Sequence, residues 1–134
     1  MLNTLLITFL ISALPDAAVV RFTVEVPSDR GQVLCAAFDT ASTWLTEDVV
    51  TGAVARVKNG KAVCELRGLP PGRYAISAFH DEDNDGELDT NLLGIPTEAF
   101  CASRGARASF GPPSFDDAVF DFAGGTLELS ARAE

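Results

Sequence analysis

Short apolar runs, several of them alternating with polar residues, recur along the chain between clusters of turn-forming residues. Residues 22–26 (Phe-Thr-Val-Glu-Val) alternate with the period of two that is typical of a half-buried β-strand. The same reading predicts seven strands, at 19–26, 32–38, 49–57, 62–66, 74–79, 118–122 and 126–131. No run has the period of a convincing amphipathic helix, although 39–48 has room for one helical turn anchored by Trp44 and Leu45. The pattern predicts an all-β sandwich of about seven strands.

Turn residues mark two corners of this sandwich. Asn59-Gly60 is the dipeptide that favours a tight β-hairpin turn, so the strands on either side of it are expected to pair. Residues 68–73 (Gly-Leu-Pro-Pro-Gly-Arg) force a sharp corner, because proline fixes the backbone and glycine permits unusual angles. Tyr74 follows at once, and we expect its hydroxyl to hydrogen-bond back onto this corner, as in other β-sandwiches.

The segment 91–113 is predicted to be one long irregular loop, since glycines and prolines interrupt it repeatedly. Loops of this length without secondary structure are usually functional.

The first residues suggest export. Residues 5–14 are apolar but too short to span a bilayer, and small residues follow at Ala13, Ala17 and Ala18, as around a signal-peptide cleavage point. Residues 1–4 carry no Lys or Arg, so a mis-set start codon, a weak signal or an N-terminal strand are alternatives. We predict a signal peptide at 1–18, a single domain at 19–134, a periplasmic or secreted location, and no membrane insertion after cleavage.

Composition limits the possible partners. The 134 residues, of which 47% are hydrophobic, suffice for one core. The net charge of −9 argues against binding to nucleic acid or to anionic membrane surfaces, which repel an acidic protein.

The sequence allows two interpretations of the three cysteines. None forms a Cys-x-x-Cys pair and the single histidine is distant in sequence, so a zinc site is improbable. Cys35 and Cys64 lie in predicted strands, where they are either two small buried hydrophobic residues or a disulfide between facing strands. Cys101 is left over in both readings.

The acidic segment is the strongest chemical feature. No Lys or Arg lies between Tyr74 and Ser103, whereas the stretch holds seven acids: Asp81, Glu82, Asp83, Asp85, Glu87, Asp89 and Glu98. Asp81, Asp83 and Asp85 fall at positions 1, 3 and 5 of a calcium-binding loop. Glu87 offers its backbone carbonyl at position 7, and Asp89 reaches the ion from position 9, directly or through water. The predicted metal ligands are therefore Asp81, Asp83, Asp85, Glu87 and Asp89, and the predicted ion is Ca²⁺.

The match to a complete EF-hand fails at position 12, where Leu92 replaces the bidentate glutamate. We therefore expect weak binding, with a dissociation constant of about 10⁻⁴–10⁻³ M. The alternative is an exposed acidic turn without an ion.

Two other classes of function compete with a calcium-binding module. One is a small hydrolase built from His80, Asp81, Glu98 and Asp116, which requires these side chains to meet in one pocket. Adjacent residues of a strand point to opposite faces, so His80 is expected to brace the long loop by a hydrogen bond instead. The other is a carbohydrate- or peptide-binding module that uses an exposed Trp44 and the segment 91–113.

Several motifs together resemble one bacterial exported family, catalogued as domain of unknown function 2141. They are Gly-Leu-Pro-Pro-Gly-Arg-Tyr at 68–74, Phe-His-Asp at 79–81, Leu-Asp-Thr-Asn at 88–91, Leu-Gly-Ile-Pro-Thr-Glu at 93–98 and Phe-Gly-Pro-Pro-Ser-Phe-Asp-Asp-Ala at 110–118. The resemblance covers roughly residue 20 to the C-terminus. It implies a signal peptide and an immunoglobulin-like or transthyretin-like β-sandwich, and it implies no known reaction. Residues 99–104 (Ala-Phe-Cys-Ala-Ser-Arg) depart from the Tyr-Gly-Phe-Ser-Asn-Asn type of segment that the family usually has there.

The sequence thus predicts an exported module that is not an enzyme, with a structural calcium loop at 81–89 and an envelope or extracellular partner of unknown identity.

Overall fold

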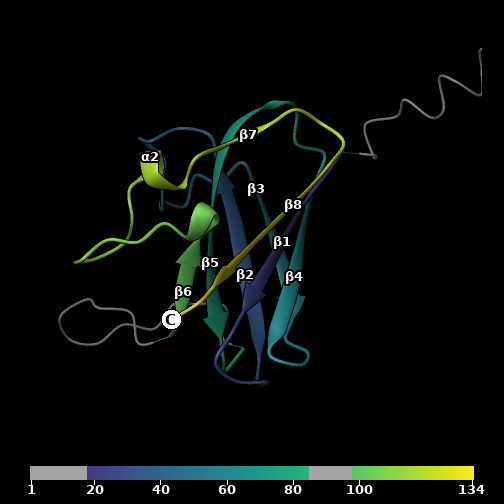
Figure 1. The fold of residues 1–134 in the computed structure, drawn as a ribbon, viewed down its shortest axis with the longest axis vertical. Helices are drawn as coiled ribbons and strands as arrows, with labels where there is room; N and C mark the ends of the chain where they lie inside the picture. The colour runs from purple at the N-terminus through teal and green to yellow at the C-terminus, as the bar shows by residue number, and fades with distance from the viewer. Residues whose placement is uncertain (1–17, 85–97) are drawn as a thin grey trace, which may run out of the picture.

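The computed structural model describes residues 18–84 and 98–134, and within them eight strands form two packed sheets (Figure 1). The strands are β1 (Val19–Glu25), β2 (Gln32–Phe38), β3 (Thr51–Arg56), β4 (Lys61–Arg67), β5 (Gly72–Asp81), β6 (Phe100–Ala102), β7 (Phe120–Phe122) and β8 (Thr126–Arg132). The 3₁₀ turn η2 (Ser103–Gly105) and the short helix α2 (Phe115–Ala118) precede β7. The prediction of an all-β sandwich is confirmed.

The smaller sheet has the strand order β4-β1-β8, and the larger has β3-β2-β5-β6, with β7 pairing to β5. β1 pairs antiparallel with β4 but parallel with β8. Every predicted strand is present within a few residues. The main addition is β6, which together with η2 lies inside the stretch predicted to be irregular. No helix in the described residues is long and apolar enough to cross a membrane.

Alternating side chains of both sheets form the core between them. β4 shows the pattern most simply, since every second residue is buried and the others face solvent. Phe22 on β1 and Ile76 on β5 are completely buried and belong to the same cluster. This is the alternation on which the sequence prediction rested.

A disulfide crosses this core. Cys35 on β2 and Cys64 on β4 are bonded, with their Cα atoms 6.4 Å apart, so the bond joins one sheet to the other. The sequence allowed either two buried free cysteines or a disulfide between them, and the structure contains the disulfide. Cys101 on β6 is a buried free thiol, and burial raises its pKa to about 12.

Both predicted turns form, but the strands that Asn59-Gly60 joins do not pair as expected. β3 belongs to the larger sheet and β4 to the smaller, and only an isolated bridge between Lys58 and Lys61 forms at the turn. Asn59 and Gly60 have φ angles of 54° and 76°, as the central residues of a tight hairpin turn require. The Tyr74 hydroxyl donates a hydrogen bond of 2.5 Å to the carbonyl of Pro70, which confirms the tyrosine corner.

A second, smaller apolar cluster lies on the outer face of the larger sheet. Trp44 packs edge-on against Phe38 and Phe115, and its indole N–H donates to the Pro113 carbonyl at 2.9 Å. The prediction that Leu45 also anchors this connection is wrong, because its side chain is 41% exposed and its backbone has a positive φ of 63°. Trp44 therefore ties two loops together, with its ring occupied by intramolecular contacts.

Candidate metal centre

The end of β5 and the approach to β6 bring three carboxylates together. Asp81 is the last residue of β5, Asp83 lies in the turn after it, and Glu98 lies two residues before β6. The antiparallel β5–β6 ladder pairs Phe79 with Phe100, and it continues through a 2.8 Å hydrogen bond from the His80 N–H to the Ala99 carbonyl. One further step in the same register places Glu98 opposite Asp81.

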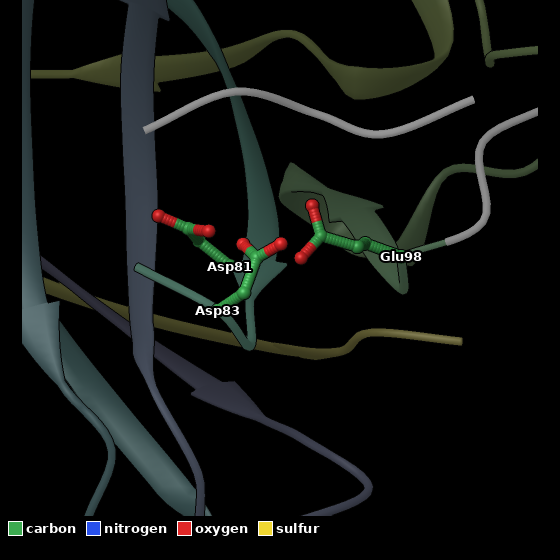
Figure 2. A group of neighbouring side chains, drawn as sticks. All are labelled: Asp81, Asp83 and Glu98. Carbon is green, nitrogen blue, oxygen red and sulfur yellow. The ribbon is translucent and has the colours of Figure 1, made fainter. Parts of the chain in front are cut away.

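One oxygen from each of these three carboxylates lies within 4.8 Å of the others. Figure 2 shows Asp83 between Asp81 and Glu98. Asp81 is completely buried and Glu98 is 8% exposed, whereas Asp83 is exposed. Two buried acids and one at the surface are an arrangement that can hold a metal ion.

Hydrogen bonds from neighbouring strands orient the two buried carboxylates. Gln32 lies opposite Asp81 in the β2–β5 register, and its Nε2 donates to Asp81 Oδ2 at 2.8 Å. The backbone N–H of Glu82 donates to Glu98 Oε2 at 2.9 Å. Each bond fixes the orientation of the carboxylate that accepts it.

The turn between β1 and β2 packs directly against this site. Gly31 has a φ of +77°, and a Cβ added there would lie 2.2 Å from the carbonyl oxygen of Asp81. Ser28 Oγ donates to Glu82 Oε2 at 3.3 Å, and the Arg30 guanidinium lies 4.0 Å from the same carboxylate. Only glycine fits at 31, and its close approach fixes the backbone that carries Asp81.

His80 makes hydrogen bonds to two segments beside this site. It lies opposite Val33, its ring is completely buried, and its Nε2 lies 2.6 Å from the Arg30 carbonyl. Because a carbonyl only accepts, Nε2 carries a proton. The His80 side chain therefore braces the β1–β2 turn, whereas the bond from His80 to the long loop predicted at 91–113 comes from its backbone N–H, which donates to Ala99.

The four side chains that the hydrolase hypothesis requires do not all meet in one pocket. Asp81 and Glu98 meet, but Asp116 is an exposed residue of α2, at the other end of the sandwich (Figure 1). Ser103 ties α2 to β5 there, accepting from the Ile76 N–H and donating to the Ala118 carbonyl.

Of the five predicted ligands, Asp81 and Asp83 are in the cluster, while Asp85, Glu87 and Asp89 lie outside the described residues. Glu98 was missed as a member of this cluster. Glu98 could have been found from the pairing register of β5 and β6. Once residues 100–102 are recognised as a strand antiparallel to β5, Glu98 falls opposite Asp81.

The donor set is chemically simple. Three carboxylates supply hard oxygens and a charge of up to −3, and no Lys or Arg occurs between Tyr74 and Ser103. Oxygen-only sites of this kind suit Ca²⁺, Mg²⁺ or Mn²⁺ rather than copper or structural zinc.

One comparison with known proteins gives a match. The model of a family described as an uncharacterised protein conserved in bacteria, domain of unknown function 2141, matches residues 23–130. No curated protein and no solved structure matches the chain.

Proposed function

The chain belongs to the uncharacterised bacterial family domain of unknown function 2141, and we propose that it is an exported, non-catalytic β-sandwich module with a structural calcium site. The ion binds Asp81, Asp83 and Glu98 and fastens the end of β5 to the approach to β6. The module serves recognition by an envelope or extracellular partner.

The convergence of three carboxylates, two of them buried, is the observation that supports this proposal. At separations of up to 4.8 Å, two ionised carboxylates repel each other by about 3–4 kcal/mol at an effective dielectric constant of 20. A divalent cation replaces this repulsion with attraction.

Calcium suits the site better than magnesium because the protein supplies several carboxylates from two separate segments, the end of β5 and the approach to β6. Ca²⁺ accepts six to eight oxygens in irregular geometry, whereas Mg²⁺ demands a near-ideal octahedron and keeps its waters. Asp85, Glu87 and Asp89 remain the proposed source of further ligands. We expect a dissociation constant of about 10⁻⁴–10⁻³ M, which is the range of extracellular calcium modules.

Two observations support export. Cys35 and Cys64 form a disulfide, and such bonds persist in the periplasm or outside the cell. β1 begins at Val19, directly after the proposed signal peptide at 1–18.

A calcium titration followed by thermal melting tests the site. With a dissociation constant of about 1 mM, 10 mM Ca²⁺ stabilises the fold by about 1.4 kcal/mol. That corresponds to a rise in Tm of about 5 °C for a domain of this size. EDTA should reverse the rise, and equal Mg²⁺ should give a smaller one. Absence of a calcium-dependent rise would contradict the proposed site.

Substitutions of Asp81, Glu98 and Asp89, together with a control substitution of Glu128, separate the possible ligand sets. Asp81→Asn and Glu98→Gln should each abolish the calcium shift, since each removes a charged ligand while preserving side-chain size. Glu128→Gln, on the exposed face of β8, is the control and should leave the shift unchanged. If Asp89→Asn abolishes the shift while Glu98→Gln retains it, the ion is bound by the acidic loop alone and Glu98 is not a ligand.

Export is tested by expressing the full-length chain in a bacterium and determining the N-terminus of the periplasmic or secreted form. We expect cleavage near Ala17 or Ala18. A full-length product retained in the cytoplasm would contradict it.

A further inference from the structure

β3 is an edge strand that lacks the usual protection of a sheet edge. In the part of the chain that the structure describes, it pairs only with β2, so one side of its backbone forms no ladder with another strand. Exposed edges commonly carry charges or proline, which discourage pairing with another chain. β3 reads Thr-Gly-Ala-Val-Ala-Arg, with no proline and no charge before Arg56.

The other edges are protected. β4 carries Lys61, Glu65 and Arg67 on its outward face, and β8 carries Glu128 and Arg132 on its own. β6 is covered by the chain itself, because Phe100 and Glu134 exchange two backbone hydrogen bonds of 3.2 and 3.3 Å. β7, the remaining edge, has only three residues and carries the exposed Asp121. β3 is therefore the edge most open to a further strand.

Exposed apolar side chains gather at this edge. Among the described residues, the large hydrophobic side chains that are exposed number six, and four of them lie in the segment 45–54, on β3 or its approach. Val54 on β3 is 63% exposed, and Val49 and Val50 just before the strand are 41% and 42% exposed. Burial of these valines would favour association.

The charges that flank β3 are arranged with opposite signs at its two ends. Glu47 and Asp48 precede the strand, and Arg56 and Lys58 lie at and beyond its end; all are exposed. None of the ion pairs among the described residues involves any of these four. The segment 47–58, with β3 inside it, therefore has an acidic start, an apolar middle and a basic end, and it is complementary to itself when two copies run antiparallel.

We propose that β3 pairs antiparallel with β3 of a second copy of this chain, forming a two-fold symmetric dimer. An axis near Gly52 places Asp48 of one copy opposite Arg56 of the other, because both lie four positions from it. The same axis places Val50 opposite Val54. A parallel arrangement would set like charges side by side, which disfavours it.

The interface is independent of the proposed metal site, which lies at the end of β5 on the other side of β2. This register pairs residues 48–56, so residues 48–50, which precede β3, join the ladder on association. Nine positions make a contact about 30 Å long, which still falls among small, reversible interfaces. We expect a dissociation constant of about 10⁻⁵–10⁻⁴ M, observed as a monomer–dimer equilibrium.

Sedimentation equilibrium from about 5 to 500 µM protein tests the dimer across that range. Arg56→Glu and Asp48→Arg should each weaken dimerisation about tenfold or more, because each sets like charges opposite one another. The double variant Asp48→Arg/Arg56→Glu restores opposite charges and should return the dissociation constant to within about threefold of the original.

Glu128→Arg on β8 is the matched control, since it changes the net charge as much as Asp48→Arg does, and it should leave the equilibrium unchanged. Measurements in Ca²⁺ and in EDTA should agree, so a failure of the calcium site does not affect the outcome. A monomer at every concentration overturns the proposal, as does a dimer that the single reversals leave intact or the double variant fails to restore.

Discussion

The disulfide between Cys35 and Cys64 gives the most direct quantitative test of the fold. Replacing both cysteines by alanine removes the only disulfide between the sheets in the described residues. The two cysteines are 29 positions apart, and the chain-entropy model gives about 3.6 kcal/mol for closing a loop of that length. Removal of two buried sulfur atoms adds roughly 0.8 kcal/mol each, similar to the loss of a methylene group. The total is about 5 kcal/mol.

Urea unfolding of the oxidised protein and the double variant measures this difference. A loss of about 5 kcal/mol lowers Tm by roughly 20 °C for a domain of this size. Cys101→Ala is the matched control, because it removes one buried sulfur without breaking a cross-link, and it should cost about 0.8 kcal/mol.

The comparison with Cys101→Ala decides the result. If the double variant loses only about twice as much free energy of unfolding as Cys101→Ala, the cross-link contributes nothing and the reasoning is refuted. Thiol titration of the unfolded, unreduced protein gives an independent check, since it should find one free thiol per chain rather than three.

Three smaller predictions follow from the same structure. Tyr74→Phe should lower the free energy of unfolding by about 1 kcal/mol in a urea titration, because it deletes the hydrogen bond to Pro70; an unchanged value would show that the corner does not depend on it. Burial also raises the pKa of Tyr74 above 10.0, so in unfolding titrations its contribution to stability should persist below pH 10 and decline as the pH rises through the folded-state pKa. Cys101, with its pKa raised to about 12 by burial, should resist a thiol reagent at pH 8 until the protein is unfolded, and rapid labelling of the native protein would contradict its burial.

Local signals made most of the fold predictable. The strand at 32–38 was bounded correctly because an apolar run begins directly after the turn at 27–31. The Asn59-Gly60 turn and the Tyr74 corner were predictable because each depends on residues within a few positions.

Features that depend on long-range pairing were not predictable in the same way. β6 has only three residues, too few for a periodic signal, and lies among turn residues. Without β6, nothing indicated that Glu98 would return to Asp81, so the predicted ligands were confined to one loop. The disulfide could be neither asserted nor excluded, because it depends on Cys35 and Cys64 facing each other across two sheets.

The position of β1 has a consequence for how the protein is made. β1 lies in the middle of its sheet, and its parallel partner β8 is the last strand, so Val19 pairs with Thr126. Until β8 has been synthesised, one side of β1 stays open and the smaller sheet cannot cover the core. Contacts between the two ends of a chain also slow folding, because the intervening loop must close first. The smaller sheet is therefore completed only when β8 is available, and its folding depends on a contact between two segments that are far apart in the chain.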